Sequence, residues 1–185
     1  MIVGIITGKG TVPLFQVLSN VKINAQYYVD YVLRPLFTVH LPALYGREIN
    51  KVFFHHDKSS SHTANLTTQY LEQLKSEIDI SYISREDIPV KAPDASPLDF
   101  FGFGYLKQHL LKRRAVTLEG VWKVAKEVWS GINQELIGSV FSSWKRRLRL
   151  VSAKDGEHIE QTKDIHRRPI KKCQIKSFQN KVNTL

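Results

Sequence analysis

The sequence predicts an α/β fold in which short strands alternate with helices. Two apolar or β-branched runs, at residues 2–6 and 12–17, are separated by Gly8-Lys9-Gly10 and predict a β-hairpin. Two further short apolar runs predict strands that are separated by a helix, and long amphipathic helices follow them. The expected order is hairpin, helix, strand, helix, strand and three helices. This alternation favours a mixed sheet, parallel in its middle and flanked by helices.

The first helix is expected to begin after Asn24, a residue that commonly caps helix N-termini. Helical spacing then joins an apolar set that comprises Tyr27, Tyr28, Val32, Leu33 and Leu36. Pro35 complicates the last turns of this helix, and Pro42 and Gly46 suggest that the chain then turns away. The run Val52-Phe53-Phe54 predicts a short buried strand that leads into His55-His56-Asp57.

The second half of the chain is expected to be mostly helical. Ser59, Ser60 and Ser61 are candidate caps for a helix over residues 62–76, and a second short strand follows at 78–83. After a proline-punctuated loop, Pro97 is a suitable first residue for the next helix. Two amphipathic helices then carry apolar stripes at 118–132 and 137–151.

Composition indicates one intracellular globular domain with a polyanionic partner. The chain has 185 residues and a net charge of +10, from 27 Lys and Arg against 17 Asp and Glu, and such a domain favours nucleic acid. Residues 160–185 hold seven basic and two acidic residues without apolar periodicity, so we expect a flexible basic tail there. Cys173 is the only cysteine, which agrees with a reducing compartment. No apolar run approaches the ~20 residues of a membrane helix.

Two aspartates are candidate metal ligands. Asp57 follows a predicted strand, where open α/β sheets bind ligands, and Asp99 lies at the start of a predicted helix. Brought together, the two carboxylates could hold a hard divalent cation such as Mg²⁺. From spacing alone the alternatives stay open: Asp57 could be a turn residue, and Asp99 a charge at a helix N-terminus.

Two segments resemble the mariner-type transposases, which belong to the ribonuclease-H-like superfamily and use an Asp-Asp-Asp/Glu triad. One is similar to the segment around the second catalytic carboxylate of that family: His56-Asp57-Lys58-Ser59-Ser60-Ser61-His62. The other resembles the family's Pro-Asp-x-x-Pro-x-Asp/Glu segment: Ala92-Pro93-Asp94-Ala95-Ser96-Pro97-Leu98-Asp99. Residues 58–98 separate the two carboxylates, a spacing that fits a subgroup ending in Asp. Asp57 and Asp99 would then be catalytic ligands of Mg²⁺ or Mn²⁺.

The resemblance implies a partial transposase catalytic domain at residues 1–159, followed by the basic tail at 160–185. It also implies DNA as partner and nuclear localisation, and allows a homodimer, with no membrane and no small-molecule substrate. The family's first catalytic Asp lies on a strand before the hairpin, and only Asp30 and Glu48 precede Asp57 here. We therefore expect a truncated ribonuclease-H-like fold whose first strand is missing.

Such a chain is expected to bind metal weakly and to cleave little or no DNA, so enzymatic activity is uncertain. The alternative is a non-catalytic DNA-binding or dimerising protein derived from a transposon. Two basic clusters are candidate DNA-phosphate contacts, although solvated helix faces would also explain them: Lys112, Arg113 and Arg114, and Lys145, Arg146, Arg147 and Arg149. His55, His56 and His62 match no zinc spacing. The aromatic stretch 100–105 favours core packing over base stacking.

Overall fold

The computed structural model describes residues 1–17, 20–88 and 95–153. Within these ranges short strands and helices alternate along the chain, as the sequence predicts for an α/β protein. The predicted basic tail at 160–185 lies outside the described residues, as do positions 154–159 at the end of the expected domain. The same holds for Pro89, Pro93 and Asp94 of the predicted loop.

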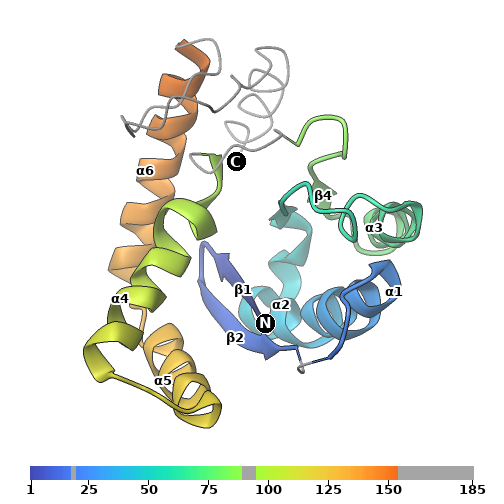
Figure 1. Ribbon diagram of the computed structural model, residues 1–185. Coiled ribbons are helices and arrows are strands. Elements are labelled where there is room, and N and C mark those ends of the chain that lie inside the picture. The colour runs from blue at the N-terminus through green and yellow to red at the C-terminus, as the bar shows by residue number, and fades with distance from the viewer. Residues whose placement is uncertain (18–19, 89–94, 154–185) are drawn as a thin grey trace.

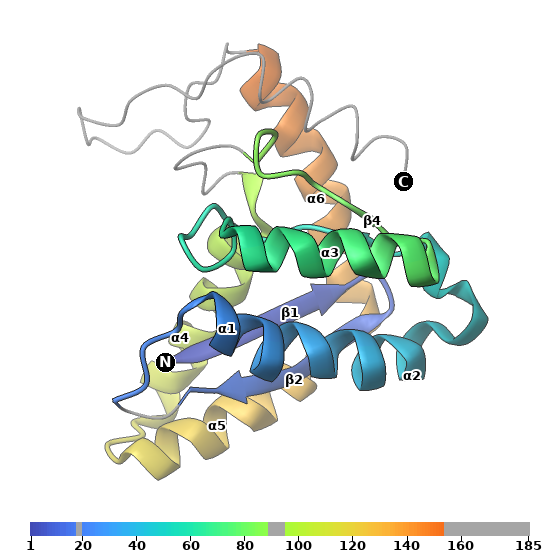
Figure 2. The same ribbon diagram turned by 90° about the vertical axis from the view of Figure 1, so that its right-hand side faces the viewer.

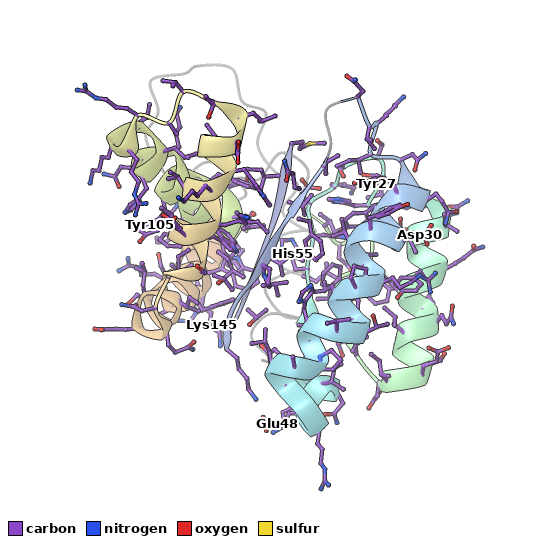
Figure 3. All side chains as sticks on the ribbon, turned by 90° about the horizontal axis from the view of Figure 1, so that it is seen from below. Tyr27, Asp30, Glu48, His55, Tyr105 and Lys145 are labelled. Atoms are coloured by element: carbon purple, nitrogen blue, oxygen red, sulfur yellow. The ribbon has the colours of Figure 1, made fainter. Side chains whose placement is uncertain are left out.

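The N-terminal hairpin is formed by β1 (Ile2–Thr7) and β2 (Gly10–Gln16), which pair antiparallel. Gly10 supplies the turn, since its φ of 146° is readily adopted only by glycine. Both faces of the hairpin are covered: Val3, Ile5 and Val12 contact one core cluster, whereas Ile2, Ile6 and Leu14 contact another. Figure 3 shows the hairpin edge-on between two groups of helices.

A helical segment follows the hairpin and continues through its prolines. It comprises α1 (Ala25–Tyr28), the π-helical segments η1 (Val29–Leu33) and η2 (Leu36–His40), α2 (Leu41–Tyr45) and the 3₁₀ segment η3 (Gly46–Lys51). The predicted cap is confirmed, because the Asn24 side chain accepts a hydrogen bond from the Tyr27 N–H. Pro35 lies between the two π segments and does not end the helix. Gly46 ends α2 with a φ of 53°.

The next unit is β3 (Phe53–Phe54), α3 (Asn65–Ile78) and β4 (Ser81–Tyr82), and its two strands pair in parallel as predicted. The predicted start of the helix at residue 62 is wrong, because α3 begins at Asn65 after Ala64. The serines do not cap it: the Ser59 carbonyl accepts hydrogen bonds from the N–H groups of His62 and Thr63, which close a separate turn. Figure 2 shows α1 and α3 side by side over one face of the hairpin.

The expected single mixed sheet is replaced, among the described residues, by two sheets of two strands each. The hairpin is antiparallel and the β3–β4 pair is parallel, and no backbone pairing joins the two sheets in this part of the chain. Helices cover both sides, so the molecule has three layers (Figure 1).

The last four helical elements cover the other face of the hairpin. They are the π-helical segment η5 (Leu98–Gly102), α4 (Phe103–Arg113), α5 (Leu118–Ser130) and α6 (Gln134–Ala153). The indole of Trp129 is 1% exposed, and its Nε1–H donates a 2.8 Å hydrogen bond to the Val12 carbonyl. This bond and the packing around it attach α5 to the hairpin.

A third core cluster attaches α6 to the segment that precedes Asp99. Trp144 and Leu148 of α6 are buried with Ile83, Ile88 and Ala95. The Trp144 Nε1–H donates a 2.9 Å hydrogen bond to the Ala95 carbonyl. None of the described helices is both long enough and apolar enough to cross a membrane.

Candidate metal centre

Asp57 lies just beyond β3, in a turn that its own side chain stabilises. The chain leaves the parallel pair after Phe54, and the Oδ1 atom of Asp57 accepts a 3.0 Å hydrogen bond from the backbone N–H of Ser59. An aspartate that binds the backbone two residues further on is a common way to fix a turn. The side chain remains 63% exposed, so it can accept a ligand from solvent.

Asp99 lies in the first turn of η5, which follows Pro97. Its backbone N–H donates to the Ser96 carbonyl at 3.1 Å, and its side chain is exposed. A π-helical turn holds one more residue than an α-helical turn and occurs frequently at functional sites. The Trp144–Ala95 hydrogen bond lies four residues before Asp99 and fixes the approach to this turn.

The two aspartates are within electrostatic reach of each other. Partial burial raises the pKa of Asp99, the negative charge of Asp57 raises it further, and Ser96 opposes both effects. Two carboxylates that repel each other in this way favour the binding of a shared cation. The two site residues that the sequence singles out thus interact electrostatically, one from a strand end and one from a helix start.

Asp57 has a close neighbour in His62. The Nδ1 atom of His62 lies 2.6 Å from Oδ1 of Asp57. The two atoms are close, but the angle at the ring nitrogen does not meet the geometry of a hydrogen bond, so the contact is an electrostatic one. This contact is the main cause that holds the pKa of Asp57 below its usual range, and the Ser59 N–H adds to it against the effect of burial. The Asp57 carboxylate is therefore ionised at neutral pH, the form that binds a cation.

Three rings lie next to one another beside this carboxylate: those of Tyr28, His56 and His62. The ring of His62 lies 4.0 Å from that of Tyr28 and 5.0 Å from that of His56, between centroids. The Tyr28 hydroxyl lies 3.3 Å from Nδ1 of His56. Burial, together with the charge of Asp57, raises the pKa of Tyr28, and burial lowers the pKa of His56 to about 3 and that of His55 to about 4. At neutral pH His55 and His56 are therefore uncharged.

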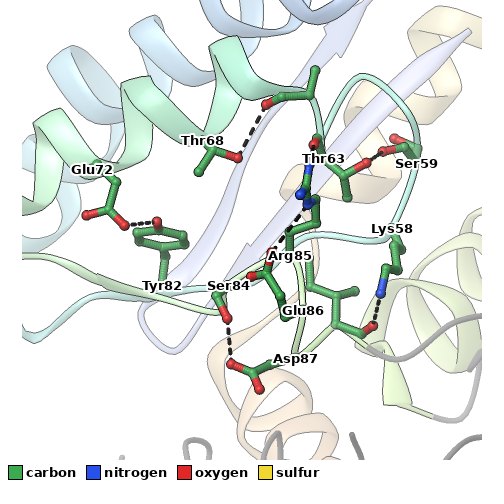
Figure 4. Close-up of polar contacts among 12 residues, drawn as sticks. Lys58, Ser59, Thr63, Thr68, Glu72, Tyr82, Ser84, Arg85, Glu86 and Asp87 are labelled. Atoms are coloured by element: carbon green, nitrogen blue, oxygen red, sulfur yellow. Dashed lines mark hydrogen bonds and ion pairs between the residues drawn. The ribbon is translucent and has the colours of Figure 1, made fainter.

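Polar contacts connect the loop after Asp57 with the segment that leads toward Asp99 (Figure 4). Lys58 donates from Nζ to the Ile88 carbonyl at 3.1 Å, and Arg85 donates from Nη1 to the Thr63 carbonyl at 3.2 Å. Ser84 donates to Asp87 at 2.5 Å and fixes the turn in between. These hydrogen bonds join the loop after Asp57 to residues 85–88, which precede the segment of Asp99.

The residues present fit a weakly held divalent cation. Asp57 and Asp99 offer carboxylate oxygens, the ligands that Mg²⁺ and Mn²⁺ prefer, and Mg²⁺ usually keeps several of its waters. Among the described residues there is no group of three or more His, Cys, Asp or Glu side chains that could hold a metal. Two protein ligands would leave the geometry of such an ion poorly fixed.

The two basic clusters lie at different distances from the carboxylates. Arg147 lies over the ring of Phe100, the residue after Asp99, with its guanidinium carbon 4.5 Å from the ring centroid. Lys112 and Arg113 are in the last turn of α4, roughly 20 Å along the helix from Asp99 at ~1.5 Å per residue. The cluster on α6 therefore borders the carboxylates, and the cluster on α4 does not.

The remaining basic residues have different surroundings. Arg113 forms a 2.5 Å ion pair with Glu127 of α5, and Arg114 ends α4 with a left-handed backbone conformation. Arg146 and Arg149 are exposed on α6, and Lys145 is partly exposed. The α6 side chains thus present positive charge to solvent beside the buried Trp144, whereas Arg113 is engaged within the molecule.

The aromatic stretch after Asp99 packs mainly into the core, as expected. Phe100 contacts the cluster around Trp144, and Phe101 and Tyr105 contact the cluster around Trp129. Phe103 is the exception, at 42% exposed. Core packing therefore accounts for three of these four rings without a role in base stacking.

Comparison with known proteins gives this chain no family: no protein-family model matches it, and no curated protein matches it either. The assignment of a function therefore depends on the geometry around Asp57 and Asp99 and on the resemblance of the two segments that carry them.

Sequence reasoning missed how the surroundings of Asp57 are organised. Tyr28 has the helical spacing of a core residue, and nothing in that pattern indicates that it stacks on His62. The turn at Asp57 had a local signal, because an aspartate side chain commonly accepts from the backbone N–H two residues further on, which here is that of Ser59. The contact between His62 and Asp57 depends on that turn and could not be derived from spacing alone.

Proposed function

We propose that this chain is a nucleic-acid-binding domain of mariner-type transposase descent, in which Asp57 and Asp99 bind a divalent cation weakly. The proposal rests on the positions of these two carboxylates, one after β3 and one at the start of η5, and on their electrostatic interaction, through which the charge of Asp57 contributes to the raised pKa of Asp99. The proposed partner is DNA, the proposed cation is Mg²⁺ or Mn²⁺, and the proposed compartment is the nucleus.

The order of elements supports a ribonuclease-H-like fold for this domain. An antiparallel hairpin is followed by a helix, a strand, a helix and a second strand parallel to the first, and helices cover both faces. Asp57 follows one strand of the parallel pair, and Asp99 starts a helix after the other. In the proposed lineage these positions carry the second and third catalytic carboxylates.

The first carboxylate of such a triad has no substitute among the residues that precede Asp57. Asp30 of η1 pairs with Arg34 at 3.4 Å and accepts from Gln26 at 2.6 Å. Glu48 of η3 pairs with two lysines at 2.6 Å each, which lower its pKa to about 2. Figure 3 shows Asp30 and Glu48 in the helical layer on one side of the hairpin, and Glu48 is held there by Lys9 of the hairpin turn.

Two carboxylates are fewer than strand transfer requires. Divalent cations, if held by enough carboxylates, would supply stabilisation for the negative charge that develops during strand transfer. In this chain Asp57 and Asp99 can orient one cation at most, and the site remains open to water. We therefore propose that the chain by itself binds DNA and a cation but cleaves DNA slowly or not at all.

A metal titration with a cleavage assay tests the site. We expect the protein to bind Mn²⁺, and expect Asp57→Asn and Asp99→Asn each to weaken binding. Asp79→Asn is a matched control, because Asp79 ends α3 in a left-handed conformation that asparagine also adopts readily. Supercoiled DNA with Mn²⁺ should remain unnicked. Cleavage that depends on both Asp57 and Asp99 would contradict the proposed inactivity, and Mn²⁺ binding unchanged in both variants would refute the site.

A salt titration of DNA binding tests the basic surface. Lys145, Arg146 and Arg149 lie on α6, the helix whose Arg147 packs against Phe100, and changing all three to Gln removes three candidate phosphate contacts. The slope of log K against log salt concentration is expected to decrease by about 2 to 3, at ~0.9 per phosphate contact. Fluorescence anisotropy with a labelled DNA duplex provides the measurement.

The matched control removes the same charge elsewhere, with Lys75→Gln on α3 and Lys123→Gln and Lys126→Gln on α5. This variant should keep a steeper salt dependence than the α6 variant. Equal slopes for both variants would indicate that net charge alone attracts DNA. If DNA binding persists while Mn²⁺ binding is undetectable, the alternative of a DNA-binding protein without chemistry is supported instead.

A further inference from the structure

The carboxylate of Asp57 is held on one side only. Its Oδ1 atom accepts from the Ser59 N–H at 3.0 Å and lies 2.6 Å from Nδ1 of His62. No contact of this kind involves its Oδ2 atom among the described residues. An aspartate that is 63% exposed would otherwise rotate freely, so these two contacts decide where its second oxygen points.

His62 is itself fixed by its neighbours. Its side chain is only 18% exposed, and its ring lies against the ring of Tyr28, which is 3% exposed. The ring of His56 is nearly parallel to that of His62, at 13°, and lies next to both His62 and Tyr28. Because Tyr28 belongs to α1 and His56 follows β3, two elements of the core determine the position of the imidazole.

We propose that His62 is a positioning residue that holds Oδ1 of Asp57, so that Oδ2 faces the cation shared with Asp99. This inference rests on the proposed function, because it requires the two carboxylates to bind a metal. Groups that orient a metal ligand commonly change the affinity for the metal 10–100-fold when they are removed. A purely structural role is the competing account, in which the His62 ring only fills the space beside Tyr28.

Two substitutions at position 62 separate these accounts. His62→Phe keeps a ring for the stack with Tyr28 and His56 but removes the nitrogen that contacts Asp57. His62→Asn removes the ring but places an amide N–H close to the position of Nδ1. A positioning role predicts that Asn retains the higher affinity for Mn²⁺, whereas a structural role predicts that Phe retains the higher stability and the higher affinity.

The experiment is a Mn²⁺ titration of the full chain by isothermal titration calorimetry, with thermal unfolding measured on the same samples. We expect His62→Phe to fold as stably as the unaltered chain and to bind Mn²⁺ about tenfold more weakly. We expect His62→Asn to be less stable yet to bind more tightly than His62→Phe. His40→Phe is the matched control, because His40 of η2 packs against Phe15 and the structure records no contact between it and Asp57 or His62 among the described residues, and its affinity should remain near that of the unaltered chain.

The result that overturns this inference is Mn²⁺ binding that Asp57→Asn weakens but His62→Phe leaves unchanged. In that case the metal site stands and the positioning role does not. Mn²⁺ binding that is absent, or that Asp57→Asn does not weaken, refutes the proposed site and the positioning role together. The two failures are thus distinguished by the Asp57→Asn titration.

Discussion

A methyl group added at Gly4 would meet the indole of Trp129. An ideal Cβ at this position would lie 3.1 Å from both Cη2 and Cζ2 of the ring, and 3.4 Å from Cδ2 of Leu14. The ring cannot move away easily, because it is buried and its Nε1–H is bonded to the Val12 carbonyl at 2.8 Å. Overpacking by one methyl group typically costs about 1–3 kcal/mol. The reduced flexibility of the unfolded chain offsets about 0.4–1 kcal/mol of this.

Gly4→Ala is therefore expected to lower the free energy of unfolding by about 1–2 kcal/mol. Trp129→Phe removes the two ring atoms that the added methyl group would touch, and it also removes the hydrogen bond, at a cost of about 1–3 kcal/mol. In the Trp129→Phe background the methyl group fills space that the smaller ring leaves. We expect Gly4→Ala to be nearly neutral there, which gives a coupling energy of about 1–2 kcal/mol between the two positions.

Urea unfolding followed by far-ultraviolet circular dichroism measures all four proteins of this cycle. Fluorescence is unsuitable, because the chain has three tryptophans and one of them is changed. At about 1–3 kcal/mol per molar urea, the single Gly4→Ala change should lower the midpoint by roughly 0.3–2 M. Additive effects, within about 0.5 kcal/mol, would refute the close approach of Gly4 and Trp129.

Three further predictions concern stability. Because burial lowers the pKa of His55 to about 4 and that of His56 to about 3, the unfolded chain binds more protons below pH 6.5. The free energy of unfolding should therefore decrease as the pH falls from 6.5 toward 4, and His56→Gln should reduce this decrease. Leu33→Ala, at a fully buried position, should cost about 2–5 kcal/mol in urea unfolding, whereas Leu111→Ala, at a 69% exposed position, should cost less than about 0.5 kcal/mol. Asn24→Ala should cost about 1 kcal/mol by loss of the helix cap, and a smaller effect of Asn24→Ala than of Leu111→Ala would contradict the cap.

Local sequence patterns predicted the elements of this fold well where a single apolar face, turn or cap residue determines the structure. The hairpin around Gly8-Lys9-Gly10, the cap at Asn24 and the parallel pair that includes Phe53 all follow from such patterns. The start of α3 did not, because the turn that Asp57 and Ser59 form competes with helix initiation at Ser61. The N–H groups of His62 and Thr63 bind the Ser59 carbonyl in the turn, so they are not the first N–H groups of a helix capped by a serine side chain.

The candidate site was predictable only in part. The positions of Asp57 and Asp99, after a strand and before a helix, implied that they could meet. The neighbours that orient them come from distant parts of the chain: Tyr28 from the first helix, and Trp144 from the last. Such contacts depend on how layers pack, and residue spacing within one element contains no information about them.

The hairpin contributes to both core clusters, which has a consequence for the folding behaviour of the chain. A strand pair with apolar side chains on both faces links the helices of one layer to those of the other. If the helices of either layer unfolded alone, the apolar side chains on that face of the hairpin would be exposed to water. We therefore expect both layers to unfold together as one cooperative unit. In native-state hydrogen exchange, the hairpin amides should exchange last, at the free energy of global unfolding.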